Sequence, residues 1–346
     1  MRLTLVALIP HLAGSSFVVP PPRAPALRTA RPLLSASTQP SVLIEPDEPS
    51  VGAALCTILR SEYEQAIAEK GSFVFCISGG SMLKMLAQLA DDRSTGIDWS
   101  RCTMGFVSHR CVPLDADGAT YAKALPAFLQ SWAERGLNVL TPTGSTDADA
   151  EAGAYEAAWS ALPRSVLPYD DAGFPVFDLL LIGVGMDGHV GSIYPNIPDV
   201  DSECVFVPIT GRDGMGKIST KISLSLAAMR ASKTSVVACA GTSAKAPLGK
   251  AEAMVRALEA EETPFTFPAA ALRSTATWLL DTPSAALLTT AKPGAAAPAD
   301  AISTTAPAVP VEEMTPLDNL VFVGYIGGFV VFFYAVAAII GAVSPQ

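Results

Sequence analysis

The stretch FDLLLIGVGMDGHVGS, residues 177–192, joins a continuous apolar run to a glycine-rich turn. A run that is apolar throughout predicts a strand buried on both faces of a parallel sheet. Gly183, Gly185 and Gly188 spell G-x-G-x-x-G, the dinucleotide-binding fingerprint, which requires a long helix directly after the turn. Pro195 follows too soon for such a helix, so we expect no dinucleotide cofactor here.

The same stretch contains His189, one of only three histidines in the chain. A histidine at the carboxyl end of a strand is placed to exchange protons with a bound ligand, because its ordinary pKa lies near neutrality. The surrounding glycines let the backbone approach that ligand closely. A purely structural histidine is the alternative that the residues alone leave open.

Strand and helix patterns alternate through residues 42–290. The runs SFVFCIS, TMGFVS, CVFVPIT, KISLSL and TSVVACAG predict further strands. Helical spacing separates them, most clearly over residues 51–71 and 243–262. We therefore predict one doubly wound α/β domain with a largely parallel sheet, whose ligands bind at the carboxyl ends of the strands.

A second predicted strand, FVFCI, ends in a turn of small residues. The turn consists of Ser78, Gly79, Gly80 and Ser81 and leads into a helical pattern. Such a turn lets backbone N–H groups approach an anion at a helix N-terminus. A tight strand-to-helix connection without a ligand explains the glycines equally well.

A third predicted strand, TMGFV, is followed by Ser108, His109 and Arg110. Arg110 can grip a phosphate with two parallel hydrogen bonds, or it can lie solvated at the surface. His109 can titrate near neutrality, or its place beside a loop can be incidental.

The composition limits the class of protein. The chain has 346 residues, a formal net charge of -10 and a pI of about 4.8, without a Lys/Arg-rich run, so we expect no nucleic-acid partner. Its six cysteines show no C-x-x-C spacing, and several lie in apolar runs. This pattern predicts buried reduced thiols and disfavours a disulfide framework or a zinc site.

The N-terminal residues 1–41 have the composition of a targeting leader. A short apolar stretch of signal-peptide type is followed by an acid-free segment that carries arginines and hydroxyl residues, as transit peptides do. This two-part leader resembles that of algae with secondary plastids, and an ordinary unstructured N-terminus is the alternative.

The C-terminal part carries a membrane signal. Residues 291–318 are rich in Ala, Pro and Thr, which predicts a disordered linker. Residues 320–343 contain no charge, and a helix over these 24 residues spans ~36 Å, enough for a hydrocarbon core of ~30 Å. We predict a transmembrane helix over 319–344 and thus a single-pass membrane protein. Its glycines suit packing against another membrane helix, so a thylakoid membrane complex is a candidate partner.

Six ordered blocks of the globular part resemble the 6-phosphogluconolactonase family in its eukaryotic form. They are SGGSMLKML, WSRCTMGFVSHRCVP, the ATY that follows, PVFDLLLIGVGMDGHVGSIYP, KISLSL and WLLDTPSAALL. The resemblance covers about residues 45–290 and implies a NagB/RpiA-like fold. It also implies hydrolysis of 6-phosphogluconolactone in the oxidative pentose phosphate pathway, without a metal or other cofactor. The related aminosugar-phosphate isomerases carry N-E-P-G where this chain has SIYP, so they fit less well.

The resemblance implies roles for individual residues. His189 would activate a water molecule to attack the lactone carbonyl and then return the proton to the departing ring oxygen. The residues that would bind the substrate and its phosphate are Ser78, Gly79, Gly80, Ser81, Arg110, Gly188, Lys221 and Lys245. Lys221 stands where the family usually has an arginine, so the charge is kept and the bidentate geometry is lost. Lys245 matches the phosphate lysine of the family after a one-residue insertion.

The chain departs from the family pattern at the rim of this site. The family carries Asp-Glu-Arg where this chain has Ser108, His109 and Arg110, so two carboxylates are missing. Ala227 and Arg230 also replace a proline and an asparagine. Two functional hypotheses follow: a membrane-tethered plastid 6-phosphogluconolactonase, or a catalytically weak or inactive lactonase-like subunit of a thylakoid photosynthetic complex.

Overall fold

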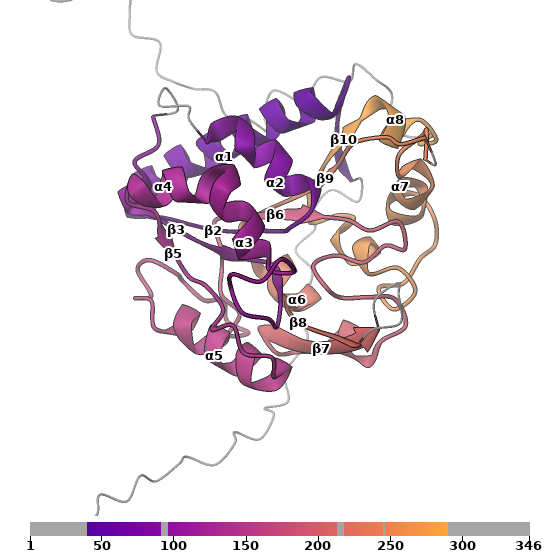
Figure 1. Cartoon of the computed structure of the whole chain (residues 1–346). Helices are drawn as coiled ribbons and strands as arrows, with labels where there is room; N and C mark the ends of the chain where they lie inside the picture. The colour runs from indigo at the N-terminus through magenta and orange to yellow at the C-terminus, as the bar shows by residue number, and fades with distance from the viewer. Residues whose placement is uncertain (1–39, 91–95, 213–217, 245, 290–346) are drawn as a thin grey trace, which may run out of the picture. The chain divides into compact units, whose positions relative to one another are not determined.

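The structure is a computed structural model that describes residues 40–90, 96–212, 218–244 and 246–289 (Figure 1). Nearly all of the predicted leader, the predicted linker and the predicted transmembrane helix lie outside these ranges. Within them, no helix combines the length and the apolar character that crossing a membrane requires.

The main sheet of the described residues has seven strands in the order β1-β10-β9-β6-β2-β3-β5, and its neighbouring strands run parallel. Its strands are β1 (Ser41–Glu45), β2 (Phe73–Ile77), β3 (Cys102–Phe106), β5 (Asn138–Val139), β6 (Leu179–Gly183), β9 (Thr234–Cys239) and β10 (Thr277–Asp281). The prediction of a largely parallel sheet is confirmed.

Helices cover both faces of this sheet. They are α1 (Glu48–Lys70), α2 (Ser81–Leu86), α3 (Thr120–Ala124), α4 (Gln130–Glu134), α5 (Ala148–Ser160), α6 (Leu226–Ala231), α7 (Ala251–Leu258) and α8 (Thr282–Ala285). Short 3-10 or π-helical turns occupy Ala87–Leu89, Trp99–Arg101, Leu125–Leu129, Pro198–Asp201 and Pro268–Leu272. Figure 1 shows α1, α2 and α4 on one side of the sheet and α5 and α6 on the other, as expected for a doubly wound fold.

The alternation of side chains in β2 explains why its sequence is apolar throughout. Phe73, Phe75 and Ile77 pack into the core under α1 and α2, whereas Val74 and Cys76 point to the opposite core. Successive residues of a strand face opposite sides of a sheet, so a strand covered on both sides needs apolar residues at every position.

A second, antiparallel sheet forms outside the main one. It has the order β4-β8-β7, with β4 (Ser108–Arg110), β8 (Ile218–Leu224) and β7 (Phe206–Arg212). The runs CVFVPIT and KISLSL are strands as predicted, but they belong to this sheet, which packs on α5. The strand pattern does not anticipate a separate sheet, because the pairing of β4 with β8 joins segments distant in sequence.

One predicted helix is shorter than its pattern. Helical spacing extends over residues 243–262, yet α7 begins only at Ala251. Pro247 disfavours helical geometry in the preceding residue, and Gly249 adopts a positive φ of 55°. The segment before Ala251 is therefore a loop.

The cysteines agree with the expectation of unpaired thiols. All six lie in the described residues, where they form no disulfide bond; five of them are buried, whereas Cys204 is exposed.

The space around Gly105 in β3 yields a test of the packing between the sheet and α5. A Cβ at Gly105 would lie 2.2 Å from Cζ2 of Trp159 and 2.5 Å from the Tyr155 hydroxyl group, which accepts the Phe106 N–H. We expect Gly105→Ala to lower the free energy of unfolding by about 2–3 kcal/mol, because overpacking a core is destabilising. Gly153→Ala is the matched control: a Cβ there meets nothing within 4 Å, and alanine in a helix should stabilise by about 0.5–1 kcal/mol. Urea unfolding measures both, and equal changes would contradict this account.

Candidate active site

The neighbouring strands β6, β2 and β3 end at one edge of the main sheet, beside a cavity of about 320 Å³. This edge is where ligands bind in open parallel sheets. The predicted site residues that line the cavity are Ser78, Gly79, Gly80, Ser81, Arg110, His189 and Lys221. Gly188 does not line it, and Lys245 lies outside the described residues.

His189 is paired with Asp187, a residue that the sequence analysis did not single out. Nδ1 of His189 lies 2.6 Å from Oδ1 of Asp187, and the His189 backbone N–H donates to the same oxygen at 3.2 Å. Burial acts to raise the pKa of the Asp187 carboxyl, but the neighbouring His189 and these hydrogen bonds outweigh it, so the pKa is lowered. An ionised carboxylate only accepts hydrogen bonds, so Nδ1 carries a proton, and in the neutral form of the ring Nε2 has the free lone pair. Nε2 is therefore the atom that can accept a proton.

The turn that carries this pair depends on Gly185. Its N–H donates to the His189 carbonyl at 2.8 Å, and its own carbonyl accepts the Gly188 N–H at 3.1 Å. A Cβ at Gly185 would lie 2.2 Å from Nδ1 of His189 and 2.5 Å from Oδ1 of Asp187. Any side chain at residue 185 would occupy the space of His189 and Asp187. Only glycine therefore allows the backbone to pass so close to this hydrogen-bonded pair.

Gly188 makes a packing contact beneath the turn. Its φ of 85° is left-handed, and a Cβ there would lie 2.5 Å from the ring of Phe267. Phe267 is fully buried, and the Ala269 N–H donates to the Gly188 carbonyl at 2.9 Å. The structure therefore places Gly188 against the core and does not bring it to the cavity, where the resemblance expected it.

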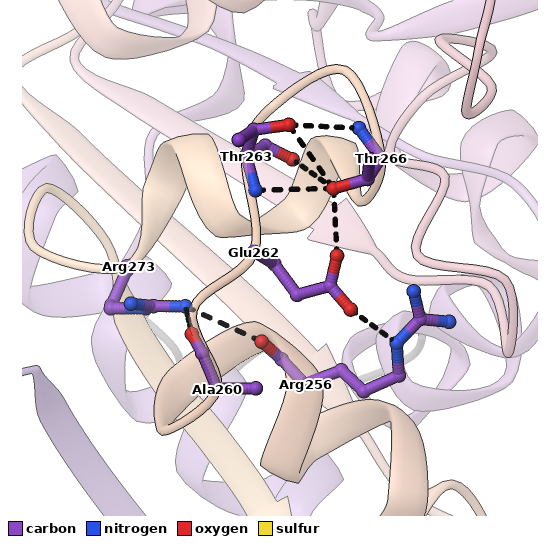
Figure 2. A network of polar contacts seen from close by, with 6 residues as sticks. All are labelled: Arg256, Ala260, Glu262, Thr263, Thr266 and Arg273. Atoms are coloured by element: carbon purple, nitrogen blue, oxygen red, sulfur yellow. Dashed lines mark hydrogen bonds and ion pairs between the residues drawn. The ribbon is translucent and has the colours of Figure 1, made fainter.

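A network of polar contacts holds the segment that contains Phe267 (Figure 2). The guanidinium carbon of Arg256 lies 4.4 Å from the centroid of the Phe267 ring, and Nε of Arg256 pairs with Glu262 at 2.6 Å. The other carboxylate oxygen of Glu262 accepts a hydrogen bond from Oγ1 of Thr266 at 2.7 Å. Arg273 donates to three backbone carbonyls of the same region. These contacts fix the residue that supports the turn.

Three cations line the cavity, and no acidic side chain of the described residues does. Arg110 on β4 and Lys221 on β8 lie directly opposite each other in the antiparallel pair, and Lys250 immediately precedes α7. Like charges opposed on neighbouring strands repel each other, and a bound anion would relieve this repulsion. Because the whole chain carries a net charge of -10, the cavity is a local concentration of positive charge that suits an anionic ligand.

Ser78 offers a hydroxyl group at the sheet edge of the cavity. Its backbone N–H donates to the Leu181 carbonyl of β6 at 2.8 Å, which fixes the residue between two strands. The side chain is buried, and its Oγ has no hydrogen-bond partner among the described residues. A buried hydroxyl group without a partner is unfavourable, so a polar ligand atom would complete this environment.

Lys250 is a site residue that the sequence analysis missed. Its ammonium group donates to the carbonyl of Val184, directly before the turn with His189. The predicted helix over residues 243–262 concealed the loop that brings Lys250 to the cavity. The resemblance instead selected Lys245, which stays a prediction.

His109 is a buried residue at the wall of the cavity. Its Nδ1 lies 2.7 Å from the Arg110 carbonyl, and its Nε2 accepts the Tyr121 N–H at 3.2 Å. The first contact requires a proton on Nδ1 and the second an unprotonated Nε2, so the ring is neutral. Burial lowers the pKa of His109. These contacts favour the interpretation in which His109 does not act as a second acid or base.

The burial of His109 predicts a dependence of stability on pH. Its pKa in the folded chain lies below the unfolded value of about 6.5, so the unfolded chain binds more protons below that pH. Stability should therefore fall as the pH is lowered from about 6.5, with a slope of at most ~1.4 kcal/mol per pH unit from this group. We expect His109→Gln to remove this part of the slope in urea unfolding between about pH 5 and 6.5. An unchanged slope would contradict the assignment.

The sequence matches one protein family. The model of the glucosamine-6-phosphate isomerases/6-phosphogluconolactonase family matches residues 46–280. The 6-phosphogluconolactonase of Bos taurus is 30% identical over 258 residues, which cover 72% of this chain and 93% of that protein. A protein of Oryza sativa subsp. indica, named "Probable 6-phosphogluconolactonase 4, chloroplastic", is 31% identical over 163 residues. That match covers 46% of this chain and 50% of the rice protein, so the chain spans about half the length of this relative.

The fold has counterparts among solved structures. The 6-phosphogluconolactonase of Trypanosoma brucei aligns with a TM-score of 0.58 and 22% identity, covering 73% of this chain and 100% of that chain. Fold and site together define an α/β protein with a cavity lined by cations at the carboxyl edge of a parallel sheet. The chain belongs to the family of glucosamine-6-phosphate isomerases and 6-phosphogluconolactonases.

Proposed function

We propose that this chain is an enzyme that hydrolyses 6-phosphogluconolactone to 6-phosphogluconate. The observation that carries the proposal is that His189, which is hydrogen-bonded to Asp187, lines the same cavity as three cations. The reaction needs this combination, because a base must act on one end of a substrate whose other end is a phosphate. Membership of the family and the similarity to the bovine 6-phosphogluconolactonase support the choice. The sequence SIYP over residues 192–195 favours a lactonase over an isomerase.

The proposed mechanism uses His189 twice. Nε2 accepts a proton from a water molecule as the water oxygen attacks the lactone carbonyl carbon. The Asp187 carboxylate stabilises the imidazolium that forms and keeps the ring oriented through Nδ1. The bond between the carbonyl carbon and the ring oxygen then breaks, and Nε2 returns the proton to that oxygen, which becomes a hydroxyl group of the product. The sequence of steps requires no metal or cofactor.

The substrate phosphate is proposed to bind at the turn after β2 and at side chains of β4 and β8. The residues assigned to it are Ser78, Gly79, Gly80, Ser81, Arg110, Lys221 and Lys245. The unpartnered hydroxyl group of Ser78 and the opposed cations Arg110 and Lys221 support this assignment. Lys250 joins the set as a further cation of the cavity.

Substitution of the catalytic pair tests the proposal. We expect the full-length chain, purified in mild detergent, to form 6-phosphogluconate from fresh lactone faster than the spontaneous reaction. His189→Ala should lower kcat about 10²- to 10⁴-fold, the usual contribution of a positioned base. Asp187→Asn should lower kcat by up to about 10⁴-fold, because the amide lacks the charge that stabilises the imidazolium and can hold the ring in the wrong tautomer. Asp201 is an exposed carboxylate that does not line the cavity, so Asp201→Asn is the matched control and should leave kcat unchanged.

A parent chain no faster than spontaneous hydrolysis would instead support the second candidate, a catalytically weak or inactive lactonase-like subunit of a thylakoid membrane complex. One observation favours it: Ser108 and His109 stand where the family carries acidic residues. Ser108→Asp is the informative reversion, because His109→Glu would set a carboxylate against the Arg110 carbonyl that His109 now contacts. An inactive parent and an active Ser108→Asp variant would assign the loss of activity to this position.

We further propose that the enzyme is a single-pass membrane protein of the plastid, in an alga with secondary plastids, with the membrane helix in the thylakoid. The supporting features are the leader over residues 1–41, a lactonase-like domain over 42–290, the linker over 291–318 and the apolar stretch of 320–343. Relatives from rice and Arabidopsis thaliana are named as chloroplastic.

Alkaline extraction tests the tether. Membranes from cells that express the full chain should retain it at alkaline pH, because an apolar helix of this length partitions into the hydrocarbon core. A variant that ends at residue 290 should appear in the supernatant. Recovery of both proteins in the supernatant would contradict the membrane anchor.

A further inference from the structure

Tyr194 lies between the proposed base and one of the cations of the cavity. Its hydroxyl group accepts a hydrogen bond from the ammonium group of Lys221, which also lies 4.6 Å from the centroid of the Tyr194 ring. On its other side, the ring centroid of His189 lies 4.8 Å from that of Tyr194, with the planes inclined by 36°. One side chain therefore contacts both the residue that would move the proton and a residue that would bind the phosphate.

Tyr194 also stands at the boundary between two cavities. Tyr194, Lys221 and Arg110 line both the first cavity and a second one of about 640 Å³, whose walls include Ile197 and Ile209. A lysine is a point charge on a flexible stem, so its ammonium group can turn toward either cavity unless a partner fixes it. The Tyr194 hydroxyl group is such a partner.

We propose that Tyr194 is a positioning residue that holds the Lys221 ammonium group at the first cavity and thereby makes the site selective for a phosphorylated lactone. An arginine keeps its orientation through its planar, bidentate fork, which Lys221 lacks. The hydrogen bond to Tyr194 supplies the orientation that the side chain itself does not. This inference rests on the proposed lactone hydrolysis and adds the residue that sets the preference among lactones.

Tyr194→Phe tests the role of the hydroxyl group, because it keeps the ring against His189. Kinetics of the full-length chain are compared for 6-phosphogluconolactone and for gluconolactone, which lacks the phosphate. We expect KM for the phosphorylated lactone to rise about tenfold, the effect of losing one charge-assisted hydrogen bond, with kcat within about twofold. The kcat/KM for gluconolactone should stay unchanged. A loss of equal size for both lactones would overturn the inference, since a structural defect acts on both.

Second substitutions at Lys221 separate positioning from folding. Tyr194→Phe combined with Lys221→Arg should restore KM to within about threefold of the parent, because the fork of arginine needs no hydroxyl partner. Lys221→Met removes the cation and should raise KM for the phosphorylated lactone. Adding Tyr194→Phe to this variant should not raise KM further, as expected for two residues that act through one interaction. A further tenfold rise in KM in that double variant would overturn the inference. If Tyr194→Phe caused a folding defect, KM would stay high in the double variant with Lys221→Arg.

Titration with inorganic phosphate provides a readout without turnover. Calorimetry should show binding about tenfold weaker in Tyr194→Phe than in the parent. If the parent does not hydrolyse the lactone but phosphate binding weakens as expected, the positioning role stands and the proposed lactonase activity fails. If the parent hydrolyses the lactone and Tyr194→Phe changes neither KM nor phosphate binding, the positioning role fails and the lactonase activity stands.

Discussion

The contact between Gly188 and the ring of Phe267 fixes the geometry on which the rest of the site depends. The turn that carries His189 is rich in glycine, so ordering it costs more conformational entropy than ordering an ordinary turn. Besides its internal hydrogen bonds, the turn packs against the ring of Phe267, which gives it a rigid support. Phe267 is in turn held by Arg256 and Glu262 from the α7 region. The position of His189 is therefore determined by residues far from it in the sequence.

The cavity combines features that are unfavourable without a ligand. Arg110 and Lys221 oppose each other on neighbouring strands, and the Ser78 hydroxyl group is buried without a partner among the described residues. Each of these features lowers stability on its own. An anion with several oxygen atoms satisfies all of them together, because it accepts hydrogen bonds and neutralises the cations. Local strain of this kind is expected where a fold has been adapted to bind a specific group.

The sequence predicts those parts of the fold that depend on the residue pattern within one short segment. The strands β2 and β6 are apolar at every position because both faces are covered, and the turn after each is marked by glycine. His189 is identifiable because Pro195 excludes a dinucleotide helix. A family resemblance adds Arg110 and Lys221, yet it does not reveal that they face each other across two strands.

The remaining parts depend on contacts that no local pattern encodes. The bond between Asp187 and His189 depends on the shape of a turn, and an aspartate near a glycine is common in turns of every kind. Lys250 reaches the cavity only because Pro247 and Gly249 interrupt a helical pattern that otherwise continues through it. The antiparallel sheet likewise depends on the pairing of distant segments, which periodicity within one segment does not specify.

The replacement of two acidic residues by Ser108 and His109 bears on the charge of the cavity more than on proton transfer. His109 is neutral and makes its hydrogen bonds to backbone groups, so it leaves the Asp187–His189 pair untouched. The lining of the cavity then carries cations without a carboxylate among the described residues. In the proposed reaction the product bears one negative charge more than the lactone, because hydrolysis creates a carboxylate. A cavity with this charge attracts the product more strongly than the substrate, and binding that is stronger for the product slows its release. If the proposed reaction takes place, the missing carboxylates would therefore affect product release more than the chemical step, which is proposed to depend on Asp187 and His189.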